Sequence, residues 1–294
     1  MPNLAPLVLD LDGGVLPLPN ARRLALPQWH APLRFACRHA TLARFASEVL
    51  ATLPAQPGTV MLGSGDFHHL SLPLLRRLRT RPPFQLVVLD NHPDNMRFPF
   101  GMHCGSWVNA AAALPQISHV HVLGITSSDI GRDHAWENHW RPLLRGRLTY
   151  WCMDVDVGWA HRLGLGRAFR RFDHPEALVA AFAAEQAQAP QPSYLSIDKD
   201  VFAEDVARSN WDQGRFQLEH ALMVVEALRA GGLVGSDITG EVSLAHYPGR
   251  FKRWLSSLDG QPQVPAEQLP VWQQQHQQVN RELLAALATV PIAC

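Results

Sequence analysis

The sequence QLVVLDNHPD, residues 85–94, joins an apolar run to a polar end. In the strand expected over Gln85–Leu89, apolar residues occupy consecutive positions, which is typical of a parallel strand that helices cover on both faces. The polar end places Asp90, His92 and Asp94 at alternating positions, and alternate residues of an extended segment project to one side. The segment therefore predicts a buried parallel strand that carries three polar side chains at its carboxyl end.

Similar strand candidates alternate with helical patterns along the rest of the chain. The other predicted strands are Leu7–Leu11, Thr59–Leu62, His119–Ile125, Leu148–Met153, Tyr194–Ile197 and Leu233–Ile238. The predicted helices are Thr41–Leu53, His69–Arg79, Trp107–Leu114, Glu176–Ala187, Leu218–Ala230 and Val271–Ala288. This alternation predicts a single three-layer α/β/α domain over residues 1–294, with a mostly parallel central sheet. Two less regular stretches, Gly158–Pro175 and Tyr247–Pro270, are interpreted as surface excursions.

Composition excludes several classes of function. The 294 residues contain 26 Lys and Arg against 26 Asp and Glu, whereas nucleic-acid and anionic-membrane surfaces need excess positive charge. No run of 18 apolar residues occurs, and the start of the chain lacks a basic leader, so neither a membrane span nor a signal peptide is expected. The four cysteines form no CxxC pair, which favours a reducing, cytoplasmic location.

Polar side chains follow four of the predicted strands directly. They lie in GSGDFHH (63–69), DNHPD (90–94), DKD (198–200) and TGE (239–241). Ligands of open α/β sheets bind at the carboxyl ends of the strands, so these four segments are expected to meet in one site.

The residue types in these segments point to a metal centre. Asp90, His92 and Asp94 form a DxHxD pattern, and Asp198 and Asp200 repeat the alternate spacing on another strand end. With a histidine from residues 63–69, the set supplies oxygen and nitrogen ligands without a thiolate, which suits Mn²⁺ better than a structural Zn²⁺. The number of ligands exceeds the need of one ion, and a two-metal site can activate water near neutral pH.

A lone DxD has a simpler interpretation as a turn or a helix cap. Asp154 and Asp156 are interpreted as such a non-functional DxD, in a loop or at the rim of the site, because no histidine lies beside them.

The motifs GSGDFHH, LDNHPD and SIDKD resemble, in order and spacing, the three metal motifs of the arginase/ureohydrolase superfamily. The resemblance covers about residues 59–245 and implies a three-layer α/β/α fold, two Mn²⁺ ions per chain and hydrolysis of guanidinium or related C–N bonds. It implies that one ion is held by His68, Asp90, Asp94 and Asp198. The other ion would be held by Asp90, His92, Asp198 and Asp200, with Asp90 and Asp198 bridging. Members of the superfamily often form homo-oligomers.

The sequence departs from the family pattern in places that concern catalysis. The first motif has an extra residue, so His68 and His69 compete for the ligand role, and His68 is preferred. The usual proton-shuttling His-Gly loop reads His103-Cys104-Gly105 here, so His103 takes that role from one position earlier, or the shuttle differs. Glu241 lies near the position of an acid that meets the guanidinium.

The stretch from Asn210 to Gln213 (Asn210, Trp211, Asp212 and Gln213) is expected either to contact substrate or to cap the helix that begins near Leu218.

Three other functions are alternatives to the binuclear hydrolase. The segment around Asp10 and Asp12 resembles the first motif of haloacid-dehalogenase-type phosphatases, but that chemistry also needs a lysine and a further acidic pair, and the sequence has only Lys199, which lies inside DKD, and Lys252. A single-zinc deacetylase-like enzyme would share the fold, and a genuine His68 ligand argues against it. A degenerate, non-catalytic homologue would explain the altered His-Gly loop. The favoured substrate is a small-molecule or peptidyl guanidino compound.

Overall fold

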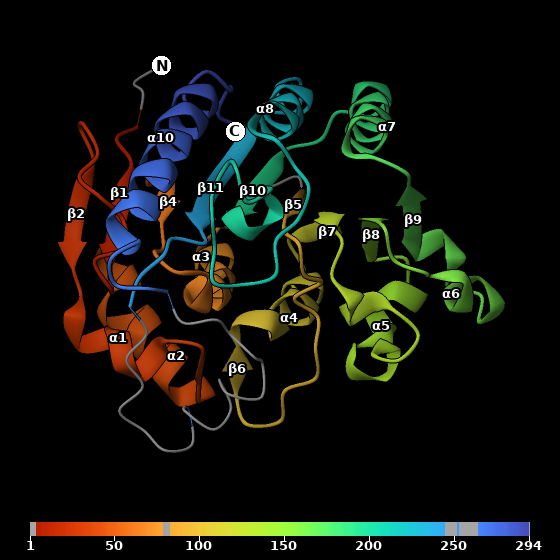
Figure 1. Cartoon of the computed structure of the whole chain (residues 1–294), viewed down its shortest axis with the longest axis horizontal. Coiled ribbons are helices and arrows are strands. Elements are labelled where there is room, and N and C mark those ends of the chain that lie inside the picture. Colours follow the sequence, from red (N-terminus) through yellow and green to blue (C-terminus); the bar gives the residue numbers. More distant parts are fainter. Residues whose placement is uncertain (1–3, 79–82, 245–251, 253–263, 294) are drawn as a thin grey trace.

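The computed structural model describes residues 4–78, 83–244, 252 and 264–293, and within them nine strands form one sheet (Figure 1). The order is β2-β1-β4-β11-β10-β5-β7-β8-β9, and every neighbouring pair is parallel. The strands are β1 (Leu7–Asp10), β2 (Arg22–Ala25), β4 (Val60–Met61), β5 (Phe84–Leu89), β7 (Ile117–Ile125), β8 (Leu148–Met153), β9 (Phe169–Phe172), β10 (Ser193–Asp198) and β11 (Leu233–Thr239). The predicted parallel sheet is confirmed.

Strand β5 shows why the sheet needs a layer of helices on each face. All six of its residues are buried. Leu86 and Val88 belong to one hydrophobic cluster, whereas Val87 and Leu89 belong to the other. Side chains alternate between the faces of a strand, so a continuous apolar run contributes to two cores at once.

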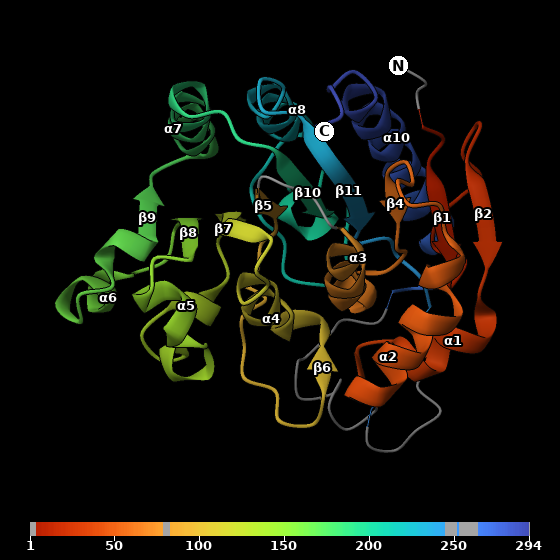
Figure 2. The same cartoon turned by 180° about the vertical axis from the view of Figure 1, so that it is seen from behind.

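Helices cover both faces, as the views from the two sides show (Figures 1 and 2). One face packs against α7 (Pro175–Gln188), α8 (Leu218–Ala227) and α10 (Leu269–Leu287). The other face packs against α1 (Pro27–Leu33), α2 (His39–Glu48), α3 (Ser71–Arg77), α4 (Val108–Ala112), α5 (Trp140–Leu144) and α6 (Gly158–Arg162). The three-layer α/β/α architecture is therefore confirmed, while the expectation of a single domain over residues 1–294 stays a prediction.

All seven predicted strands and six predicted helices are present, with ends that shift by a few residues. The helix expected over Thr41–Leu53 ends at Glu48 and is followed by a short 3-10 turn, Leu50–Thr52. The helix expected from His69 begins at Ser71, because residues 65–70 form 3-10 turns that belong to the site described below.

The interpretation of Gly158–Pro175 as a surface excursion is wrong, because this stretch contains α6 and the edge strand β9. The charged sequence FRRF of β9 concealed the strand. The Arg170 guanidinium lies over the Trp151 ring, 3.8 Å from its centroid, so the arginine covers apolar surface at the edge of the sheet.

The edge strand β2 and a two-stranded antiparallel pair, β3 (Ala36–Cys37) with β6 (Met102–His103), were also not predicted. Most of the other excursion, Tyr247–Pro270, lies outside the described residues. Within the described part of the chain, no helix is both long enough and apolar enough to cross a membrane.

Replacing Leu86 by alanine should lower the free energy of unfolding by about 2–5 kcal/mol, because the cavity left in the central strand cannot collapse. Urea denaturation followed by circular dichroism measures this change. The matched control is Leu144→Ala, since Leu144 is 63% exposed and should shift stability by less than about 0.5 kcal/mol. Equal effects of the two changes would contradict the assignment of β5 to the centre of the core.

Candidate metal centre

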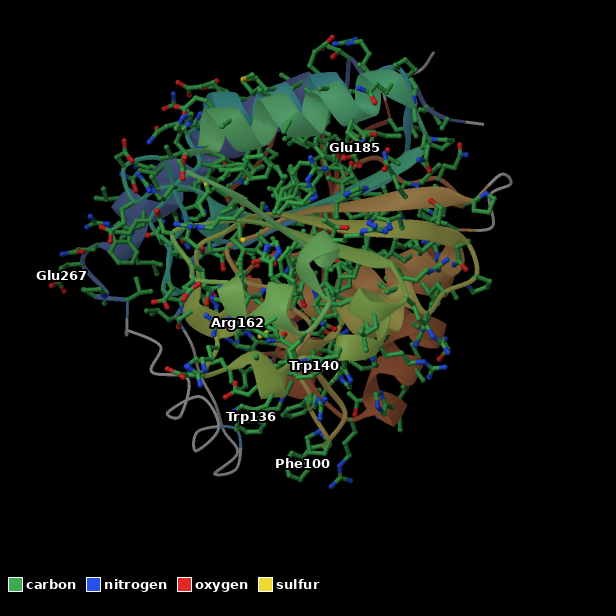
Figure 3. The ribbon with its side chains drawn as sticks, turned by 90° about the vertical axis from the view of Figure 1, so that its right-hand side faces the viewer. Phe100, Trp136, Trp140, Arg162, Glu185 and Glu267 are labelled. Atoms are coloured by element: carbon green, nitrogen blue, oxygen red, sulfur yellow. The ribbon has the colours of Figure 1, made fainter. Side chains whose placement is uncertain are left out.

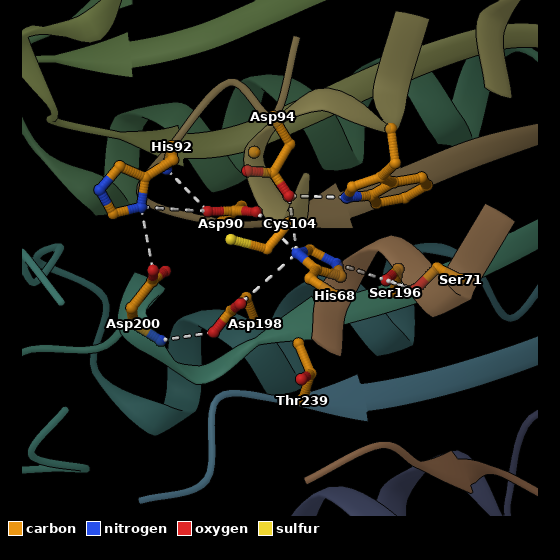
Figure 4. Close-up of polar contacts among 12 residues, drawn as sticks. His68, Ser71, Asp90, His92, Asp94, Cys104, Ser196, Asp198, Asp200 and Thr239 are labelled. Atoms are coloured by element: carbon orange, nitrogen blue, oxygen red, sulfur yellow. Dashed lines mark hydrogen bonds and ion pairs between the residues drawn. The ribbon is translucent and has the colours of Figure 1, made fainter. Parts of the chain in front are cut away.

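The four polar strand ends meet because their strands are neighbours. Strands β4, β11, β10 and β5 are consecutive in the sheet and parallel, so their carboxyl ends lie along one edge. Figure 4 shows the side chains that converge there from residues 68, 90–94 and 198–200. The six residues expected to hold metal are thus brought together.

His68 stands among three carboxylates. Its Nδ1 lies 2.8 Å from Asp94 Oδ2, 3.2 Å from Asp90 Oδ2 and 3.4 Å from Asp198 Oδ2. Its Nε2 is 3.0 Å from Ser196 Oγ, and this contact on the far side of the ring directs Nδ1 toward the carboxylates. His68, Asp90 and Asp94 offer ligand atoms that could hold one ion.

His92 forms a second group that shares Asp90 with the first. Its Nδ1 lies 2.9 Å from Asp200 Oδ2 and 3.7 Å from Asp90 Oδ1, so the two oxygens of Asp90 face different histidines. The backbone N–H of His92 donates to Asp90 Oδ1 at 2.7 Å, and that of Asp200 donates to Asp198 Oδ1 at 3.2 Å. The two groups therefore form one continuous cluster.

Burial of four aspartates within this cluster carries an electrostatic cost. Burial and the neighbouring Asp90 raise the pKa of Asp94 to about 7, and burial and Asp200 raise the pKa of Asp198. Burial also raises the pKa of Asp200, whereas the contacts of Asp90 with His68 and His92 outweigh burial and lower its pKa to about 2. Like charges held this close need positive charge among them.

The donor atoms fit divalent cations. His68 Nδ1 and Asp90 Oδ2 are buried and make no hydrogen bond with any described residue, although they face each other across 3.2 Å. Buried polar atoms without a hydrogen-bond partner are uncommon, and a bound ion satisfies them. Carboxylate oxygens with two imidazoles are the ligand set of Mn²⁺ and similar ions, so the residues present fit the metal that the family resemblance implies.

Trp107 holds Asp94 in place, and sequence reasoning did not identify it. The indole Nε1–H donates to Asp94 Oδ2 at 2.6 Å. Asp94 itself has a positive φ of 45°, a conformation that aspartate tolerates better than most residues. Trp107 begins a predicted helix, and no pattern distinguishes it from an ordinary core tryptophan.

A buried arginine fixes the segment that carries His68. Arg34 Nε lies 2.6 Å from Asp66 Oδ2, and Arg34 Nη1 donates to Ser243 Oγ at 2.9 Å. Ser243 Oγ in turn donates to Asp12 Oδ2 at 2.6 Å. Asp12 is thus part of the support of the site, while Asp10 forms an ion pair with Arg23 at the edge strand. This arrangement does not favour the phosphatase alternative.

His69 points away from the carboxylates. It is buried, its Nε2 lies 3.8 Å from Cys37 Sγ, and burial lowers its pKa to about 3. The geometry favours His68 over His69 as the residue that faces an ion.

A cavity of about 480 Å³ opens above the cluster. Its lining includes the expected residues His103, Cys104, Asn210, Trp211 and Asp212. Gln213 instead stabilises the loop, because its Nε2 donates to the carbonyl oxygens of Phe202 and Ala207.

Sequence reasoning missed a second wall of the cavity. Asp129, His134 and Glu137 line it from the segment after β7. Short 3-10 turns, Ser128–Ile130 and Ala135–Glu137, carry this wall, and such turns leave no periodic pattern in the sequence.

Glu241 does not line this cavity in the described structure. Its Oε1 lies 2.6 Å from Lys199 Nζ and accepts a hydrogen bond from Asn280 Nδ2 at 2.7 Å. Its charge is therefore matched inside the protein.

Asp154, interpreted above as a loop residue, forms an ion pair with Arg215 at 2.5 Å and is 48% exposed.

Replacing Trp107 by phenylalanine should lower the free energy of unfolding of the metal-free protein by about 1.5–3 kcal/mol, because Asp94 loses a hydrogen bond to a charged group while a ring still fills the space. Urea denaturation after dialysis against a chelator measures this. The control is Trp136→Phe, since Trp136 is 67% exposed and lies at the periphery (Figure 3). A change for Trp107→Phe no larger than that of the control would refute the supporting role.

Comparison with known proteins agrees with this geometry at the level of the fold. No protein-family model matches the chain. An uncharacterized protein of Thermotoga maritima is 28% identical over 204 residues, which cover 69% of this chain and 66% of that protein, just under two thirds of its length.

Three solved structures superpose on nearly the whole chain. Proclavaminate amidino hydrolase from Streptomyces clavuligerus has a TM-score of 0.54 at 16% identity, covering 97% of this chain and 91% of that chain. A formiminoglutamase variant of Trypanosoma cruzi with Mn²⁺ has a TM-score of 0.53 at 14% identity, with 98% and 94% covered. The agmatine ureohydrolase of Thermoplasma volcanium has a TM-score of 0.52 at 13% identity, with 97% and 89% covered. The predicted resemblance is confirmed, and the chain has the fold of the arginase/ureohydrolase superfamily.

Proposed function

We propose that the protein is a binuclear manganese hydrolase that cleaves a C–N bond of a guanidinium-type substrate, either arginine-like or an arginyl side chain in a peptide. The observation that carries this proposal is the convergence of two histidines and four buried aspartates into two groups that share Asp90. The similar structures include an amidino hydrolase and an agmatine ureohydrolase, which supports the same class of reaction.

The proposed ligand sets are those that the family resemblance implies, and the contacts of His68 and His92 support them. His68, Asp90, Asp94 and Asp198 would hold one ion, and Asp90, His92, Asp198 and Asp200 the other. Asp90 suits a bridging role because its two oxygens point to different histidines. Two Mn²⁺ ions bound there would lower the pKa of water far enough to make hydroxide available near neutral pH and would polarise the substrate.

The charge of the cavity supports a cationic substrate. Asp129, Glu137 and Asp212 line it in addition to the proposed ligands, and none of the described residues that line it is a lysine or an arginine. The Trp211 indole also lines it, and a planar guanidinium stacks favourably on an aromatic face. These groups replace Glu241 as the proposed contacts of the substrate cation.

His103 is the proposed group that transfers the proton to the leaving amine. Its Nδ1 accepts a hydrogen bond from the backbone N–H of Gly105 at 3.0 Å, so in the neutral ring the hydrogen resides on Nε2. The ring packs edge-to-face on Phe35, with centroids 4.3 Å apart, which restricts its orientation at the cavity wall. Cys104 lines the same wall, and its Sγ lies 3.7 Å from His103 Nδ1.

Metal content tests the proposal first. Protein incubated with Mn²⁺ and then desalted should retain about two Mn per chain by elemental analysis. Mn²⁺ should also raise the melting temperature, because an ion that binds only the folded state stabilises it. One tightly held Zn would favour the single-zinc amidohydrolase instead, and the absence of any retained metal would refute the proposal.

Replacing Asp198 by asparagine should reduce urea release from guanidino substrates by more than about a hundredfold, since even residues that only support metal ligands are worth 10–100-fold. The substrates to assay are arginine, agmatine, a guanidino acid and an arginyl peptide. Asp154→Asn is the matched control, because Asp154 belongs to a similar DxD at another strand end and pairs with Arg215. Wild-type activity in the Asp198 variant would exclude Asp198 as a ligand.

Cytoplasmic location and homo-oligomerisation stay predictions, and size-exclusion chromatography with light scattering addresses the second.

A further inference from the structure

Lys199 and Glu241 form an almost fully buried ion pair next to the proposed metal centre. Lys199 separates the proposed ligands Asp198 and Asp200 in the chain, yet its side chain is 0% exposed and leaves the backbone on the opposite side. Asp198 and Asp200 contact His68 and His92 in the cavity, whereas Lys199 Nζ contacts Glu241, two residues after the end of β11, and Asn280 of α10. A buried lysine is rare unless it is paired.

The ammonium group forms a closed ring of contacts with two other side chains, Glu241 and Asn280. Lys199 Nζ lies 2.6 Å from Glu241 Oε1 and donates to Asn280 Oδ1 at 3.1 Å. Asn280 Nδ2 donates to the same Glu241 oxygen at 2.7 Å. Lys199, Glu241 and Asn280 are all buried, and we call these three residues the Lys199 triad.

The Lys199 triad joins segments that all approach the metal centre. The backbone N–H of Glu241 donates to the Gly63 carbonyl at 3.0 Å, at the start of the segment that carries His68. Gly240 has a φ of 84°, and a Cβ there would overlap the Asp198 side chain and the Lys199 backbone nitrogen. Asn280 belongs to α10, so the triad also ties this helix to the carboxyl ends of β10 and β11.

The geometry points to Lys199 as a positioning residue for the proposed metal centre. Anchoring the Lys199 side chain below the sheet edge forces the residues before and after it to project into the cavity. The backbone between Asp198 and Asp200 is then fixed, and their side chains contact His68 and His92 respectively. The effect of Lys199 on metal binding rests on the proposed function. Its effect on the conformational order of the backbone at residues 198–202 does not.

Glu241→Gln tests this inference with little change of shape. It leaves the ammonium without its counter-charge, so the turn at Lys199–Val201 should lose order. Hydrogen–deuterium exchange of a peptide that covers residues 198–202 should speed up by about tenfold or more in the metal-free protein. The affinity for Mn²⁺, from titration of the free-ion EPR signal, should fall by about 10–100-fold, the range for residues that orient metal ligands.

Two further variants separate positioning from general stability. Gln277→Met removes another buried contact of α10, the 2.6 Å hydrogen bond from Gln277 Nε2 to the Pro17 carbonyl, which involves no member of the Lys199 triad. Gln277→Met should change neither the hydrogen–deuterium exchange rate of residues 198–202 nor the affinity for Mn²⁺. The double variant Glu241→Gln, Asn280→Asp moves the negative charge to the other partner of Lys199 and should restore both to within about threefold of the parent.

The outcomes are distinct. Unchanged exchange at residues 198–202 in Glu241→Gln, or equal acceleration in Gln277→Met, would overturn the positioning role. If Glu241→Gln does not fold, Asn280→Leu removes one acceptor of the ammonium, keeps the ion pair and should give a smaller shift in the same direction; no shift would overturn the inference. Failure of the parent protein to bind Mn²⁺ would refute the proposed function alone, because the exchange result still decides the role of Lys199 in the turn.

Discussion

Mutual repulsion among Asp90, Asp94, Asp198 and Asp200 is the constraint around which this end of the molecule is arranged. Burial and the neighbouring Asp90 raise the pKa of Asp94 to about 7, and burial and nearby carboxylates also raise the pKa of Asp198 and Asp200. The neighbouring groups either donate a hydrogen bond to these carboxylates or can carry positive charge. They are the imidazoles of His68 and His92 and the Trp107 indole. Such an arrangement is unfavourable in an empty protein and becomes favourable when cations occupy it.

The sheet makes this concentration of charge possible. Parallel neighbours place all their carboxyl ends at one edge, and the two cores behind β5 keep that edge rigid. Two buried ion pairs support the segments that carry these side chains. Arg34 pairs with Asp66 behind the segment of His68, and Lys199 pairs with Glu241 behind the segment of Asp198 and Asp200. Each of these pairs lies on the side of the backbone away from the cavity. The acidic cavity on one side of the strand ends is thus backed by buried, paired charges on the other side.

The position of the Glu241 carboxylate differs from what the family resemblance implies, and its contacts give the physical reason. Glu241 comes after the β11 strand end, as the resemblance implies, but its carboxylate turns toward Lys199 rather than into the cavity. The acidic wall of the cavity is supplied instead by Asp129, Glu137 and Asp212. Under the proposed function, these acids in place of Glu241 would contact the substrate cation.

The sequence alone determined the parallel sheet, because consecutive apolar residues such as those of Gln85–Leu89 have no stable place except between two layers. It also predicted that Asp90, His92, Asp94, Asp198 and Asp200 lie together, because they follow strand ends at alternate positions, whereas His68 was preferred over His69 only through the family resemblance. It did not reveal β9, whose arginines cover the sheet edge, nor Trp107, Asp129 and Glu137, which approach from turns without periodicity. Only tertiary structure decided which neighbour each carboxylate faces, and hence that Glu241 belongs to Lys199, because that depends on distances across chain segments far apart in sequence.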